Sequence, residues 1–210
     1  NNHAFAPVTK ASRTHRLPWR NRTAWLIALY FGAQNFLFYA LISWISPFFQ
    51  EQRVPLTRAG LILASFTVAF MAGNPFFGSV SKSLDRRGWL ALSAALAAAG
   101  LLVMVLAPNS VPFIYLPVTA FGMAGAFTLG MTLPLDNTAD AAEASAWTAF
   151  VLMVAYLIAA TGPLSVGALR DLTGSFSASW ILLLAVALGM LALTPFLRLH
   201  VRAPEQRNDD

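Results

Sequence analysis

The sequence predicts an all-α, polytopic membrane protein with six transmembrane helices. Of its 210 residues, 57% are hydrophobic and 11% are charged, against about 45–50% and about 25% in soluble domains. The charged residues are confined to short stretches, which are separated by six uncharged segments of 19 to 26 residues. Each segment is close to the roughly 20 residues that a helix needs to cross a lipid bilayer. We therefore expect a six-helix bundle over residues 25–197, flanked by polar segments at 1–24 and 198–210.

The first three helices are expected at residues 25–49, 59–81 and 89–107. The first and the third begin with a tryptophan, Trp25 and Trp89, a residue that is enriched at membrane–water interfaces. The strands of a transmembrane barrel would alternate apolar and polar residues over about ten positions, but the third segment is apolar on every side. Helices satisfy their own backbone hydrogen bonds inside lipid, and they are therefore the expected spanning structure.

The last three helices are expected at residues 111–135, 144–169 and 175–197. Trp147 and Trp180 lie near the starts of the last two and again fit an interfacial belt. Small residues let transmembrane helices approach closely. The fourth segment contains three such positions, which we interpret as packing sites: Gly122, Gly125 and Gly130.

Lysine and arginine are concentrated on one side of the predicted membrane. Eleven of the 14 lie before the first helix, between the second and third, or after the sixth, and three lie on the other side: Arg53, Arg58 and Arg170. Because basic residues are enriched on the cytoplasmic side, both termini are expected in the cytoplasm. These residues adjoin apolar segments rather than forming a basic soluble face, so the net charge of +5 does not indicate nucleic-acid binding.

The two halves of the chain share weak self-similarity. Three landmarks recur with shifts of 86 to 88 positions: Pro47 with Pro134, Pro75 with Pro163, and the Asp-x-x-Gly turn at Asp85 with the one at Asp171. Transporters are often built from inverted repeats, and an odd number of helices per repeat forces the two copies into opposite orientations. We therefore predict a 3+3 inverted repeat.

Side chains for catalysis or metal binding are poorly placed. The chain has no cysteine, its three histidines, His3, His15 and His200, lie in the tails, and no acidic residue lies within the apolar segments. An intramembrane metal site or acid–base pair would need such groups. We expect no metal, no cofactor and no enzymatic activity.

A polar and aromatic stripe marks the first helix. Gln34, Asn35, Phe38 and Tyr39 occupy positions i, i+1, i+4 and i+5, which project to one side of a helix. Amides in hydrocarbon need partners from another helix or from a water-filled cavity. The stripe therefore predicts either hydrogen bonds between helices or the wall of a cavity that binds a small solute.

Four further residues inside the apolar segments are candidates for function. Asn74 and Tyr156 are additional polar candidates for solute binding. Pro75 and Pro163 each free a backbone carbonyl and permit a kink. Kinks in corresponding helices suit a protein that bends between two states, although static kinks are equally consistent with the sequence.

The start of the helical region contains a distinctive set of residues: Ala24-Trp25, Gly32-Ala33-Gln34-Asn35, Phe38-Tyr39, Trp44, Pro47 and Ala59-Gly60. This pattern resembles the start of the C-terminal half of major facilitator superfamily transporters, and most closely the cyanate and nitroimidazole transporter branch. It implies twelve helices, of which this chain supplies helices 7 to 12. Residues 1–24 would then belong to the central cytoplasmic loop, and a missing N-terminal six-helix half would be the partner.

The loop at residues 81–88 resembles the superfamily's cytoplasmic gate motif. Asp85, Arg86 and Gly88 match the motif, whereas Ser81 replaces its first glycine and Trp89 its last basic residue. In the family this loop forms a charge network that locks the inward side closed. The resemblance therefore implies a gating role for Asp85, Arg86 and Gly88. Pro75 and Pro163 are expected to contribute to gating through their kinks.

The resemblance implies a secondary transporter in a bacterial inner membrane that moves a small solute by alternating access. A cyanate-like anion or a small polar heterocycle is the expected solute. Two alternatives are a drug or metabolite exporter of the same superfamily, and a six-helix scaffold subunit without transport activity. The first residue is Asn1 and no signal peptide precedes the first helix, so we expect the chain to begin inside a longer protein.

Overall fold

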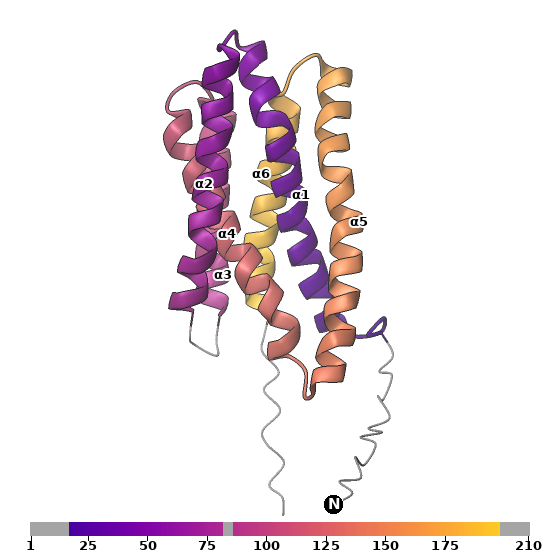
Figure 1. The fold of residues 1–210 in the computed structure, drawn as a ribbon. Coiled ribbons are helices and arrows are strands. Elements are labelled where there is room, and N and C mark those ends of the chain that lie inside the picture. Colours follow the sequence, from indigo (N-terminus) through magenta and orange to yellow (C-terminus); the bar gives the residue numbers. More distant parts are fainter. Residues whose placement is uncertain (1–16, 82–85, 198–210) are drawn as a thin grey trace, which may run out of the picture.

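Six long helices account for most of the residues that the computed structural model describes, which are 17–81 and 86–197 (Figure 1). A single 3₁₀ turn, η1, follows the last helix, and none of the described residues lies in a strand. The elements are α1 Arg22–Glu51, α2 Leu56–Val80, α3 Arg87–Leu106, α4 Pro112–Asp136, α5 Ala141–Thr173, α6 Ser177–Leu193 and η1 Thr194–Phe196. The predicted all-α fold is confirmed.

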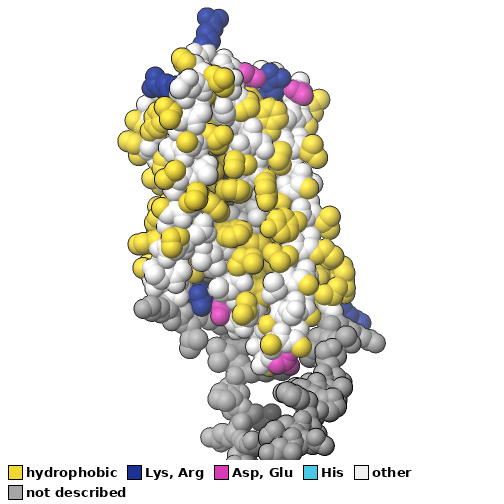
Figure 2. All heavy atoms as spheres, in the orientation of Figure 1, with side chains coloured by type: hydrophobic (Ala, Val, Ile, Leu, Met, Phe, Trp, Pro, Cys, Tyr) yellow, Lys and Arg dark blue, Asp and Glu magenta, His cyan; other side chains and the backbone are white. Residues whose placement is uncertain are grey.

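Each of the six helices is long and apolar enough to cross a membrane, judged by length and composition. On the face drawn in Figure 2, Lys, Arg, Asp and Glu side chains lie only near the two ends of the bundle, with a wide uncharged band between them. This distribution suits a bundle whose middle lies in hydrocarbon. The chain is a multi-pass membrane protein.

Several helices extend beyond the uncharged segments because polar residues cap them. The Asn21 Oδ1 accepts the backbone N–H of Thr23 at 2.9 Å and so starts α1 three residues before the first apolar segment. Asp140 caps α5 through the N–H of Glu143 at 2.8 Å, and the Glu143 carboxylate accepts the N–H of Ala139. The arrangement is similar to a capping box, except that Glu143 accepts the N–H of the residue before the N-cap rather than that of the N-cap itself.

Three helix pairs make the most extensive contacts, α1 with α5, α2 with α4 and α3 with α4. In the view of Figure 1, α3 and α6 lie behind the other helices. The starts of α1, α3 and α5 lie at one end of the bundle with the ends of α2 and α4, and the α1–α2, α3–α4 and α5–α6 connections lie at the opposite end. We call these ends the Arg86 rim and the Arg170 rim, after an arginine at each. This alternation agrees with the predicted topology, in which the Arg86 rim is cytoplasmic.

A glycine lies at a close contact in two of these helix pairs, α1 with α5 and α2 with α4. A Cβ atom at Gly162 of α5 would lie 2.5 Å from the Phe36 carbonyl oxygen of α1, and one at Gly73 of α2 would lie 2.6 Å from the Ala124 Cβ of α4. Gly162 directly precedes the proline of α5, and Gly73 lies two residues before the proline of α2. In a 3+3 inverted repeat the α1–α5 contact would correspond to the α2–α4 contact, and the repeat stays a prediction.

Candidate functional site

The two amides of the α1 stripe are buried inside the bundle. Gln34 is 0% exposed, and its Nε2 donates to the backbone carbonyl of Met123 in α4 at 3.4 Å. Asn35 is 3% exposed and donates from Nδ2 to the carbonyl of Phe31, one turn earlier, at 2.8 Å. In this structure Gln34 therefore links two helices, whereas the described bond of Asn35 stays within α1.

The two aromatic residues of the stripe lie at the edge of the bundle. Phe38 is half-buried, and its ring centroid lies 4.5 Å from that of Phe70 in α2. Tyr39 is 39% exposed, and its ring stands edge-on to Phe38 at 5.6 Å. Of the four stripe residues, Tyr39 is thus the most accessible to a solute or to another protein segment.

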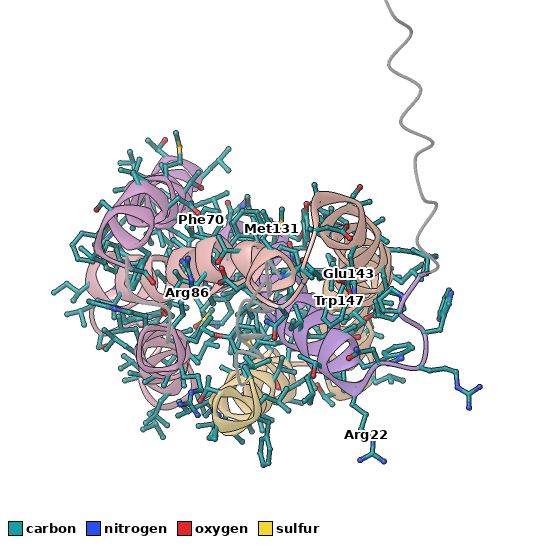
Figure 3. All side chains as sticks on the ribbon, turned by 90° about the horizontal axis from the view of Figure 1, so that it is seen from below. Arg22, Phe70, Arg86, Met131, Glu143 and Trp147 are labelled. Carbon is teal, nitrogen blue, oxygen red and sulfur yellow. The ribbon has the colours of Figure 1, made fainter. Side chains whose placement is uncertain are left out.

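Further rings extend Phe38 into a continuous aromatic wall across α1, α2 and α4. Phe70 lies 5.9 Å from Phe127 of α4, and Phe127 lies 5.4 Å from Phe31 of α1. Figure 3 places Phe70 on the side of the bundle between α2 and α5, where Met131 also lies. Phe70 and Phe127 are not among the predicted site residues, because phenylalanine in an apolar helix gives no signal that separates a binding wall from packing.

Asn74 of α2 forms hydrogen bonds with both ends of its side chain, one within α2 and one to α4. Its Nδ2 donates to the Phe70 carbonyl at 2.7 Å, and its Oδ1 accepts the Thr128 hydroxyl of α4 at 2.7 Å. Tyr156 is 47% exposed, while its neighbours Ala155 and Ile158 pack close to Gly32 of α1. The structure thus places Asn74 in helix packing and leaves Tyr156 accessible on α5.

Pro75 and Pro163 lie inside helices that continue on both sides of the proline. The carbonyl of Pro163 accepts the indole N–H of Trp44 in α1 at 2.9 Å, and the Trp44 ring also lies close to Gly167. This bond ties the α5 proline region directly to α1. Whether the two prolines act as hinges stays a prediction.

Arg86 of the predicted gate loop pairs with the last residue of α4. Its Nε lies 2.9 Å from the Asp136 Oδ2, and its Nη1 donates to the Ser81 carbonyl at 3.3 Å. Gly88 lies in the first turn of α3 with open space around its Cα, and Asp85 is outside the described residues. Asp136 is missing from the predicted site because it lies one residue beyond the fourth apolar segment.

A second ion pair joins α1 to α5 at the Arg170 rim. The Arg170 guanidinium donates from Nε and Nη2 to the Glu51 Oε1, with a Nε–Oε1 distance of 3.1 Å. Its Nη1 lies 2.9 Å from the Asp171 Oδ1. In the sequence, Arg170 is recognisable only as a topology signal and Glu51 does not stand out, because the pairing of two charges 119 positions apart depends on the fold.

Comparison with known proteins gives three transporters and no matching family model. The chain is 29% identical over 171 residues to the cyanate transport protein CynX of Escherichia coli (strain K12), covering 81% of this chain and 44% of that protein. It is 27% identical over 198 residues to a 2-nitroimidazole transporter of the same organism, covering 92% and 48%. The chain resembles the cyanate and nitroimidazole transporters.

The third relative is the uncharacterized transporter YycB of Bacillus subtilis (strain 168), which is 26% identical over 175 residues. That match covers 82% of this chain and 43% of the relative. The predicted resemblance to this branch of the major facilitator superfamily is thereby confirmed. The chain spans about half the length of the curated relatives that it matches.

Proposed function

We propose that this chain is the C-terminal, six-helix half of a twelve-helix secondary transporter that moves a small solute across a bacterial inner membrane by alternating access. The observation that carries the proposal is the match of a six-helix membrane bundle to about half the length of three transporters. A missing N-terminal half of similar size would complete the molecule. The solute site would then lie between the halves, near the middle of the membrane.

The side of the bundle between α2 and α5 is the proposed solute-facing surface of this half. It bears Phe70 (Figure 3), whose ring packs on that of Phe38. The exposed rings of Tyr39 and Tyr156 are the remaining aromatic candidates. Aromatic rings give a small planar solute an apolar face and two hydroxyl groups to bind. The buried Asn35 would line the deepest part of this site.

The proposed solute is a cyanate-like anion or a small polar heterocycle. Two of the relatives are named for cyanate and for 2-nitroimidazole transport. Among the described residues, no charged side chain lies in the middle of an apolar segment. Neutral groups of this half would therefore contact the solute, and any proton coupling would depend on the other half.

Arg86 and Asp136 are the proposed core of the cytoplasmic gate. Their ion pair joins the start of α3 to the end of α4. Asp85 and Gly88 are the further gate residues that the motif resemblance suggests. Pro75 and Pro163 are the proposed points at which α2 and α5 bend between states. This assignment places the Arg86 rim and both termini in the cytoplasm.

Solute uptake by the full-length protein in proteoliposomes tests the proposal. We expect time-dependent accumulation of radiolabelled cyanate or 2-nitroimidazole above that of empty vesicles. Accumulation of a larger, chemically unrelated drug instead would favour the exporter alternative. Pure, folded protein that moves neither class would contradict the transporter assignment and favour a scaffold subunit.

A further inference from the structure

The last residues of α1 and α4 are both acidic, and each forms an ion pair at its own rim. α1 ends at Glu51 and α4 ends at Asp136. Glu51 pairs with Arg170, and Asp136 pairs with Arg86. The ends of α1 and α4 lie at opposite ends of the bundle in Figure 1, and Figure 2 shows acidic and basic side chains together at both ends.

The two ion pairs occupy corresponding places in the predicted repeat. The acids are 85 positions apart and the arginines 84 positions apart, close to the 86 to 88 positions that separate the other repeat landmarks. In a 3+3 repeat α1 corresponds to α4 and α2 to α5. Arg86 lies six residues after the end of α2, directly before α3, and Arg170 lies in the last turn of α5. The predicted repeat would therefore bring each ion pair close to the place of the other, on the opposite side of the membrane.

We propose that Glu51 and Arg170 form a brace that stabilises closure of the Arg170 rim, as the inverted counterpart of the Arg86–Asp136 pair. The inference rests on the proposed function, because a brace of this kind has an effect only in a protein with two access states. α1 and α5 both border the proposed solute-facing side, and the Glu51–Arg170 ion pair fixes the distance between the ends of these two helices. At the opposite rim, the Arg86–Asp136 ion pair fixes the distance between the start of α3 and the end of α4.

The geometry of Arg170 suits a brace better than a loose surface contact. Its guanidinium contacts Glu51 through two nitrogen atoms and Asp171 through the third, so the planar group is held from two sides. The side chains of Arg170 and Glu51 are 39% and 44% exposed, so their contribution to folding is small. A weak interaction still changes the balance between access states when it forms fully in only one of them.

Spin-label distances in the full-length protein test the inference. A label at Asn109 and a second label in the other half report on the Arg170 rim. A label at Ala139 and a second label in the other half report on the Arg86 rim. We expect Glu51→Gln and Arg170→Gln to raise the population that is open at the Arg170 rim by about two- to fivefold. Asp136→Asn should shift the population in the opposite direction.

Two controls separate a specific pair from general charge effects. Arg58→Gln, which removes an exposed arginine of α2 at the same rim, should leave the distances unchanged. The double variant Glu51→Gln/Arg170→Gln should shift the population no further than either single variant, because both remove one interaction. Melting temperatures near that of the unsubstituted protein would show that the variants remain folded.

The outcomes distinguish the inference from the function that it rests on. A single distance distribution in the unsubstituted protein, with and without solute, would overturn both the two-state transporter and the brace. Two distributions that respond to solute and to Asp136→Asn, but not to Glu51→Gln or Arg170→Gln, would overturn the brace alone. A shift of equal size in Arg58→Gln would also overturn it.

Discussion

Nearby residues of one membrane helix can have different functions, because successive side chains point about 100° apart. Gln34 points into the bundle and hydrogen-bonds α4, whereas Tyr39 lies at the edge with more than a third of its surface exposed. One residue of the stripe therefore forms a hydrogen bond between helices, and another is placed where it can form a cavity wall. We assign Gln34 to packing and propose Tyr39 for solute contact.

Alanine substitutions at these two positions should affect different properties. Gln34→Ala removes a buried hydrogen bond and leaves a cavity, and we expect a loss of about 1–3 kcal/mol of stability with unchanged solute affinity. Tyr39→Ala removes an exposed ring, and we expect affinity to fall about 3- to 10-fold with an unchanged melting temperature. Thermal unfolding and equilibrium binding of the transported solute by the full-length protein measure both effects.

Leu29→Ala is the matched control, since Leu29 is an exposed apolar residue of the same helix. It should change neither affinity nor melting temperature. If Gln34→Ala weakened affinity without loss of stability, Gln34 would belong to the solute site after all.

The sequence alone predicts little of the site at the scale of single residues. Stripe spacing and motif resemblance point to Tyr39 and Arg86, both of which lie where a functional role is possible. Asp136 and Glu51 become visible only in the structure, because at least two helices separate each of them in sequence from the arginine with which it pairs. A charge at the end of a membrane helix is otherwise indistinguishable from an interfacial anchor.

At the scale of elements, hydropathy determines where the helices lie but not how they pair. Six uncharged segments predict six helices because lipid leaves the backbone no other hydrogen-bonding solution in a bundle of this composition. The pairing of α1 with α5 and α2 with α4 depends on small residues at the contact points. Gly73 and Gly162 are among several glycines in apolar segments, so the sequence does not single them out.

Gly162→Ala should loosen the contact between α1 and α5. The added Cβ would lie 2.5 Å from the Phe36 carbonyl oxygen, so the two backbones must separate, at a cost of about 1–3 kcal/mol. The melting temperature of the full-length protein in detergent measures this loss. Gly189→Ala in α6 is the matched control, because a Cβ there meets nothing within 4 Å. Equal melting temperatures for the two variants would contradict the packing described for α5.

At the scale of the whole molecule, the bundle presents a side lined by α1, α2, α4 and α5 and places α3 and α6 behind it. Inverted repeats create such a side in each half of a transporter, and rocking of the two halves exposes the site between them alternately to either side of the membrane. Apolar composition alone does not distinguish a solute-facing helix surface from a lipid-facing one. The assignment of this side therefore depends on the exposed aromatic residues and on the similarity to transporters.

Cysteine accessibility at Tyr39 is the most direct test of alternating access through this half. The chain has no cysteine of its own, so Tyr39→Cys in a full-length protein without other cysteines reports on this position alone. We expect an impermeant, charged thiol reagent to label it from either side of the membrane, and saturating solute to slow both reactions. Leu29→Cys on the same helix should react from neither side faster than background. Labelling of Tyr39→Cys from one side only, or from neither side, would contradict the proposed alternating-access pathway.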